Sequence, residues 1–271
     1  MNKRLLLAVP FSILLLLSVN ALSHDYWIEP EAYFVEVGQP YDVRLYLGES
    51  LKSESERPLQ KERTRSFRLF STEETEDLLA SALDGQTPLA QVTLKRPGNY
   101  LIAMERNAAT IKLGAKEFED YLLEEGLDSI REQRRESGEG ETEGRERYTR
   151  YLKSLLQAGT RRDDTFKRVV GHRLEIIPLN NPYRLKTGGK LKVRVQFDGQ
   201  PLAGASVFAY NRHAGAMSAQ KAISSGAGTV FFNLDRPGQW LVRLVHMRRC
   251  QGCEADIDWE SFWAAYSFGM R

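Results

Sequence analysis

The histidine at position 24 stands where a single cleavage would make it a metal ligand. If the chain is cut just before it, His24 offers both its α-amine and its Nδ1 to one ion and closes a chelate ring without any folding cost. The α-amine has a reference pKa of about 8, so a metal ion can compete with the proton at neutral pH. Amine and imidazole nitrogens suit nickel, cobalt, copper and zinc rather than calcium or magnesium. These residue types therefore predict a transition-metal site at a processed amino terminus.

Residues 1–23 have the composition of a signal peptide that would direct such a cut. Lys3 and Arg4 precede an apolar run from Leu5 to Val19, and the small residue Ser23 ends the segment. This order of basic, apolar and small residues is typical of secretory signal peptides. The run is shorter than the roughly 20 apolar residues of a transmembrane anchor. We expect export to the periplasm and a mature chain without a membrane span.

Only three further histidines exist, at positions 172, 213 and 246. His172 and His246 each share a face with apolar residues near the end of an expected strand, and such a place suits a sheltered ligand or a core histidine equally well. His213 is expected in a surface loop. Our hypothesis is that His24, His172 and His246 converge on one ion where two sandwiches meet, with Asp25 as a further or supporting partner.

The two cysteines, Cys250 and Cys253, are separated by Gln-Gly, which suits a tight turn. In an oxidising compartment so close a pair forms a local disulfide in most proteins. A metal-binding dithiol and a redox pair are the alternatives, although thioredoxin-like chemistry would place the pair at the start of a helix. We predict a structural disulfide in a β-hairpin.

Charge limits the class of partner. Removal of residues 1–23 takes Lys and Arg from 38 to 36, which equals the 36 Asp and Glu, so the mature chain is formally neutral. Nucleic-acid binding depends on accumulated positive charge and is not expected. The remaining chain of about 248 residues (271 minus 23) is long enough for one large or two small domains.

The pattern of residues 24–106 predicts an amino-terminal β-sandwich domain. Short apolar runs alternate with turn residues, and one run places four apolar side chains on one face: Tyr41, Val43, Leu45 and Leu47. A period of two over such a run indicates a half-buried antiparallel strand. The last strand of this domain is expected over residues 99–106.

Residues 107–170 predict a helical insertion. Phe118, Tyr121 and Leu122 follow helical spacing, and the run from Tyr148 to Leu156 repeats that spacing. Residues 136–144 between them contain glycines and acidic residues without an apolar side chain, which predicts a flexible acidic loop joining two helices.

Residues 171–271 predict a carboxy-terminal β-sandwich domain. Six strand-like runs occur, at 173–178, 190–197, 205–211, 229–234, 239–247 and 261–268. Six strands within about 100 residues are typical of immunoglobulin-like or transthyretin-like sandwiches. The expected fold class is therefore mainly β, with two sandwich domains and a helical insertion between them.

Several stretches resemble the DUF4198 family of exported bacterial proteins. They are His24–Pro30 (HDYWIEP), Gly171–Leu179 (GHRLEIIPL), Phe197–Ala205 (FDGQPLAGA) and Arg236–Trp240 (RPGQW). Members are often described as periplasmic components of nickel or cobalt transport, so the resemblance implies metal handling and a β-rich fold.

These observations together favour a non-enzymatic periplasmic protein that binds a transition metal and assists nickel or cobalt uptake beside the membrane components of a transporter. The first alternative is a copper oxidase or oxygenase built on a histidine brace, in which the α-amine and Nδ1 of the terminal histidine and a second imidazole hold one copper ion. A structural β-sandwich module with incidental histidines is the second. No phosphate-binding loop, nucleophile elbow or zinc-protease helix motif is present in the sequence.

Overall fold

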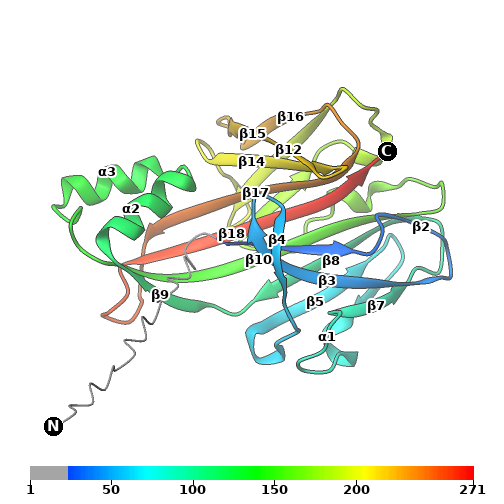
Figure 1. Ribbon diagram of the computed structural model, residues 1–271, viewed down its shortest axis with the longest axis horizontal. Coiled ribbons are helices and arrows are strands. Elements are labelled where there is room, and N and C mark those ends of the chain that lie inside the picture. Colours follow the sequence, from blue (N-terminus) through cyan, green and yellow to red (C-terminus); the bar gives the residue numbers. More distant parts are fainter. Residues whose placement is uncertain (1–23) are drawn as a thin grey trace, which may run out of the picture.

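The computed structural model describes residues 24–271, and the predicted signal peptide lies outside them. A ten-stranded sheet forms the centre of the molecule. Its main strands are, in spatial order, β15 (Ala216–Ile223), β14 (Ser206–His213), β17 (Gly238–Arg249), β18 (Trp259–Met270), β10 (Gly144–Ala158), β8 (Gly98–Arg106), β5 (Thr64–Phe70) and β6 (Thr75–Asp77). Two short strands, β2 (Phe34–Val35) and β9 (Ala109–Leu113), pair with β10. Figure 1 shows β18 in red beside β10 in green.

Two smaller sheets pack on this central sheet, one against each face. The first contains β1 (Asp25–Pro30), β3 (Pro40–Glu49), β4 (Lys52–Glu56) and β7 (Ala90–Thr93). The second contains β11 (Leu174–Pro178), β12 (Gly189–Phe197), β13 (Gln200–Pro201) and β16 (Thr229–Leu234). Each encloses its own apolar core with the central sheet. The predicted β-sandwich class is confirmed, in a form where both sandwiches share their middle layer.

The strands at the centre are apolar on both faces because both faces are covered. In β18, Phe262 and Phe268 enter the core beneath the second outer sheet, whereas Ala265 enters the opposite core. β18 pairs antiparallel with β17 and parallel with β10, from Glu146 opposite Trp259 onward. This parallel pair joins the middle of the chain to its carboxy-terminal part.

The helices cover a small part of the surface. They are α1 (Leu78–Ser81), α2 (Ala115–Glu124) and α3 (Asp128–Glu136), with short 3₁₀ turns η1 (Lys61–Arg63), η2 (Asp164–Lys167) and η3 (Pro182–Arg184). α2 and α3 lie together at one end of the molecule (Figure 1), where Phe118 and Ile130 pack against Trp259 and Trp263 of β18. Among residues 24–271, no helix has both the length and the apolarity needed to cross a membrane.

The second predicted helix, over Tyr148–Leu156, is wrong: this segment is part of strand β10. Apolar residues at 151, 152, 155 and 156 satisfy a helical period, but a strand buried on both faces shows the same unbroken apolar run. The acidic segment 136–144 therefore joins α3 to a strand. Because β10 pairs with β8 and with β18, the central sheet runs through all three predicted parts of the chain.

One carboxylate lies buried beneath the helices. Glu146 of β10 accepts a hydrogen bond from the Tyr121 hydroxyl (3.2 Å) and another from the Ser261 hydroxyl. Burial raises its pKa from 4.5 to about 7, against the opposing effect of these hydrogen bonds. The charged form is therefore disfavoured in the folded state.

This carboxylate should make the free energy of unfolding depend on pH. The stabilisation from protonated Glu146 is complete below its unfolded pKa of 4.5 and is lost as the pH rises through about 7. As the pH rises from 5 to 8, the wild-type protein should lose about 2–3 kcal/mol of unfolding free energy that the Glu146→Gln variant retains. Denaturant unfolding of both proteins across this range measures the difference, and parallel pH profiles would contradict the assignment.

Candidate functional site

His24 lies directly before β1 (Asp25–Pro30), and its imidazole contacts a carboxylate of the neighbouring hairpin. Its Nε2 is 2.7 Å from Oε2 of Glu54 on β4, and the two side chains are 16% and 47% exposed. The His24 carbonyl accepts a hydrogen bond from Nη1 of Arg150 at 3.1 Å. Pairing of β1 with β3, and of β3 with β4, brings these groups together. The second ring nitrogen, Nδ1, is left for another partner.

Asp25 points the opposite way and belongs to a buried ion-pair cluster. Its carboxylate lies 2.9 Å from Nε of Arg243 on β17, and the same guanidinium pairs with Glu125 at the end of α2. The backbone N–H of Ser50 also donates to Asp25. Burial raises the pKa of Asp25 to about 6, although Arg243 opposes the shift. Asp25 therefore anchors the start of β1 to the central sheet.

His172 is a buried side chain that packs on an aromatic ring. It precedes β11, and its ring centroid lies 5.1 Å from that of Tyr151. Burial, together with the nearby Lys153 ammonium, lowers its pKa to about 3, so it is neutral at physiological pH. Lys153 itself forms a buried ion pair with Glu175 of β11.

His246 packs between aromatic side chains of two layers. Its ring centroid is 4.5 Å from that of Phe197 and 6.3 Å from that of Phe262. Burial is the main cause of a pKa lowered to about 4, and Arg248 adds to it. The prediction that His172 and His246 lie on apolar faces agrees with these positions. His213 ends β14 and is exposed.

The structure does not bring the three histidines together. Side chains alternate between the two faces of β17, so Arg243, which pairs with Asp25, faces one outer sheet, whereas His246 faces the other. His24 lies over the face of Arg243, and His172 packs on the face of His246. The central sheet therefore separates His24 from the other two. Among residues 24–271 there is no group of three or more His, Cys, Asp or Glu side chains arranged to hold a metal ion.

The predicted Cys250–Cys253 disulfide is confirmed. It lies in the connection between β17 and β18, with the two Cα atoms 5.9 Å apart. Nearby, Asp258 forms a two-point ion pair with Arg145 of β10, which fixes this connection to the neighbouring strand. Among the acidic residues after the cysteines, Asp258 thus has a structural partner.

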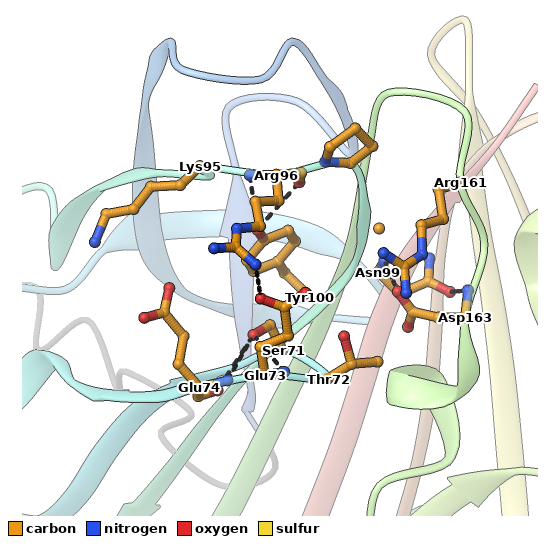
Figure 2. A pocket seen from close by; sticks show the side chains of 12 residues that line it. Ser71, Thr72, Glu73, Glu74, Lys95, Arg96, Asn99, Tyr100, Arg161 and Asp163 are labelled. Atoms are coloured by element: carbon orange, nitrogen blue, oxygen red, sulfur yellow. Dashed lines mark hydrogen bonds and ion pairs between the residues drawn. The ribbon is translucent and has the colours of Figure 1, made fainter.

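A small polar hollow of about 110 Å³ lies where β8 begins, beside the loop after β10. Figure 2 shows Asn99 and Asp163 at one side of it and Glu74 and Lys95 at the other. The Asp163 carboxylate accepts from the backbone N–H of Asn99 at 3.0 Å, and Asn99 also bonds Gln157. These groups hold one another in place and join the loop to the sheet.

Sequence reasoning missed the partners that position the predicted residues. Glu54, Arg243 and Lys153 were not singled out, although the last two interrupt long apolar runs. A lone charge within an otherwise apolar central strand is seldom left unpaired, because an isolated buried charge is costly. That interruption was the available signal, but it does not identify the partner.

Comparison of the sequence with models of known protein families gives a match to one family. The chain matches the family described as "Domain of unknown function (DUF4198)" over residues 21–248. No curated protein matches the chain. The matched region contains His24, Glu54, Asp25 and Arg243, and it ends just before the disulfide. Because the match covers most of its length, the chain belongs to the DUF4198 family.

Proposed function

We propose that the protein binds a transition-metal ion through an amino terminus created by cleavage before His24 and assists nickel or cobalt uptake in the periplasm. The observation that supports this most is the contact between His24 Nε2 and the Glu54 carboxylate. A neutral imidazole that donates its one N–H to a carboxylate has its other nitrogen free of the proton. Nδ1 is the nitrogen that an amino-terminal chelate requires.

The surroundings fix this histidine more firmly than an ordinary chain end. The Arg150 guanidinium holds the His24 carbonyl, and the buried Asp25–Arg243 ion pair holds the next residue. Because the terminus is already ordered before the metal binds, less conformational entropy is lost on binding. In this proposal, cleavage supplies the α-amine, His24 supplies Nδ1, and water or donors of a partner protein complete the coordination.

Such a two-nitrogen site suits delivery of an ion to a transporter component. A structural metal site is closed by four protein ligands, whereas an open site exchanges its ion more readily. The disulfide between Cys250 and Cys253 supports the proposed location, because disulfides form and persist in oxidising compartments such as the periplasm.

The test compares a protein that begins at His24 with one that retains residues Asn20–Ser23 before it, which takes the α-amine out of the chelate with the His24 imidazole. We expect the extension to weaken Ni²⁺ and Cu²⁺ binding, measured by calorimetry, by at least about 100-fold, because the amine is lost as a ligand. Glu54→Gln should weaken binding about 10-fold, as is common for partners of ligating histidines. Glu76→Gln, an exposed change on β6, is the matched control and should have no effect.

Two results would contradict this proposal. One is equal metal affinity with and without the four extra residues. The other is an intact mass, measured on protein taken from its native compartment, that places the mature terminus elsewhere than His24.

A further inference from the structure

A cavity of about 570 Å³ opens beside the start of β1, on the face of the central sheet that carries Arg150. The 3₁₀ turn η1, the end of β8, β9 and β10 also border it. Its lining includes four arginines and two tyrosines: Arg57, Arg63, Arg106, Arg150, Tyr26 and Tyr148. This concentration of guanidinium groups distinguishes the cavity.

The arginines of this arginine cavity lack a direct carboxylate partner among the described residues, although the charge of Arg150 acts on the buried Asp25 and Glu146 carboxyls. Glu62 is its one acidic lining residue, and no ion pair within residues 24–271 involves any of the four arginines. A neighbouring hollow offers a contrast. There, Arg65 lies 3.7 Å from Glu105, and Arg147 lies 3.2 Å from Glu260.

Two of the guanidinium groups are held rigidly. Arg106 is only 8% exposed; it donates to the Gln60 side chain at 2.8 Å and lies 5.5 Å from the centre of the Tyr26 ring. Arg150 lies 4.4 Å from the same ring and 4.8 Å from the Trp263 ring. Aromatic faces attract cations, and their packing limits the rotamers of the arginines. The charges of Arg106 and Arg150 are therefore held at the cavity wall before any ligand arrives.

Burial of a guanidinium without a carboxylate partner costs folding free energy, and a bound anion that pairs with it offsets this cost. The planar fork of arginine matches carboxylate and phosphate oxygens through paired hydrogen bonds. Of the four arginines only Arg106 is buried, while Arg57 and Arg150 are half-buried and Arg63 is exposed at the rim. Four guanidinium groups around one cavity fit a ligand with more than one anionic group. Gln60, Asn107 and Thr110 also line the cavity and can bond to hydroxyl or carbonyl groups of an organic ligand.

We propose that the arginine cavity binds small organic molecules that carry two or more anionic oxygen groups, such as polycarboxylates or phosphate esters. Its volume is larger than a single inorganic oxyanion requires. The proposal does not depend on metal binding at His24, although the two sites are adjacent through Tyr26 and Arg150. Fixed arginines would provide affinity without an ordering cost at the moment of binding.

The test uses metal-stripped mature protein at low ionic strength. Calorimetric titrations with citrate, succinate, glycerol 2-phosphate and acetate compare multivalent ligands with a monovalent one. We expect saturable binding of at least one multivalent anion, at least about 10-fold tighter than acetate. We expect Arg106→Gln to weaken that binding by about 10-fold or more, since a charge-assisted contact is removed. Arg63→Gln, an exposed change at the rim that does not threaten the fold, should weaken it several-fold.

Arg65→Gln is the matched control, because it removes the same charge from the neighbouring hollow and should change affinity less than 2-fold. Absence of saturable binding for all four ligands would overturn the proposal. So would equal weakening by Arg65→Gln and Arg63→Gln, which would indicate only diffuse electrostatic attraction. Metal titration of the same variants keeps the two proposals separate, since loss of anion binding with intact metal binding would affect this inference alone.

Discussion

Replacement of Arg243 by methionine should cost the protein about 3–5 kcal/mol of unfolding free energy, because it leaves two buried carboxylates without their shared cation. Asp25 and Glu125 come from opposite ends of the first half of the chain, and both contact this one guanidinium. In the folded protein, burial opposes the charge of Arg243, but the two carboxylates outweigh this effect and raise its pKa. Denaturant unfolding at neutral pH measures the loss.

Two further variants define the cause of that loss. Arg243→Lys keeps the charge but not the fork that reaches both carboxylates, so we expect an intermediate stability. Arg135→Met removes an exposed arginine that pairs with Glu132 on α3, and it should leave unfolding unchanged within error. If Arg243→Met were as stable as Arg135→Met, the buried cluster would not anchor β1.

Lys153→Met should have a comparable effect on the opposite face of the sheet. Lys153 of β10 and Glu175 of β11 are both buried, and the ammonium also donates to the carbonyls of Arg168 and Ile176 at 3.3 Å. Loss of the lysine leaves Glu175 charged in the core between the central sheet and the second outer sheet. We expect a loss of about 3–5 kcal/mol, measured by denaturant unfolding.

The double variant Lys153→Met/Glu175→Gln provides the decisive comparison. Because it removes both charges, the double variant should be more stable than Lys153→Met alone. If the two residues acted independently, their losses of unfolding free energy would add and the double variant would be the less stable. Lys167→Met is the surface control, because Lys167 pairs with Asp164 in an exposed turn. A double variant less stable than both Lys153→Met and Glu175→Gln, each measured alone, would show that the two residues do not act as a pair.

Most strands could be predicted from the sequence, because period-two runs ended by turn residues carry a local signal. The six runs expected after residue 171 all contain strands. β15 was missed because its sequence, AMSAQKAI, contains few large apolar residues and these do not alternate with polar ones. β10 was misassigned because burial on both faces removes the alternation that distinguishes strands from helices.

The candidate site was only partly predictable. The sequence places His24 and Asp25 next to each other, but on a strand adjacent side chains face opposite ways, so one contacts Glu54 and the other Arg243. His172 and His246 were correctly expected on apolar faces. Which faces of which sheet they occupy depends on how the outer sheets dock, and this arrangement comes from pairings between distant segments that no local pattern encodes.

The central position of β18 also determines when this molecule can fold. β18 fills the gap between β17 and β10, yet it is the last strand of the described chain. Until it arrives, β10 and β17 each present an unpaired edge, and open edges invite association with other chains. Contacts between distant segments also form slowly. During synthesis the central layer must therefore remain unassembled until this strand is complete, so protection by chaperones would be most valuable before residues 259–270 can add to the sheet.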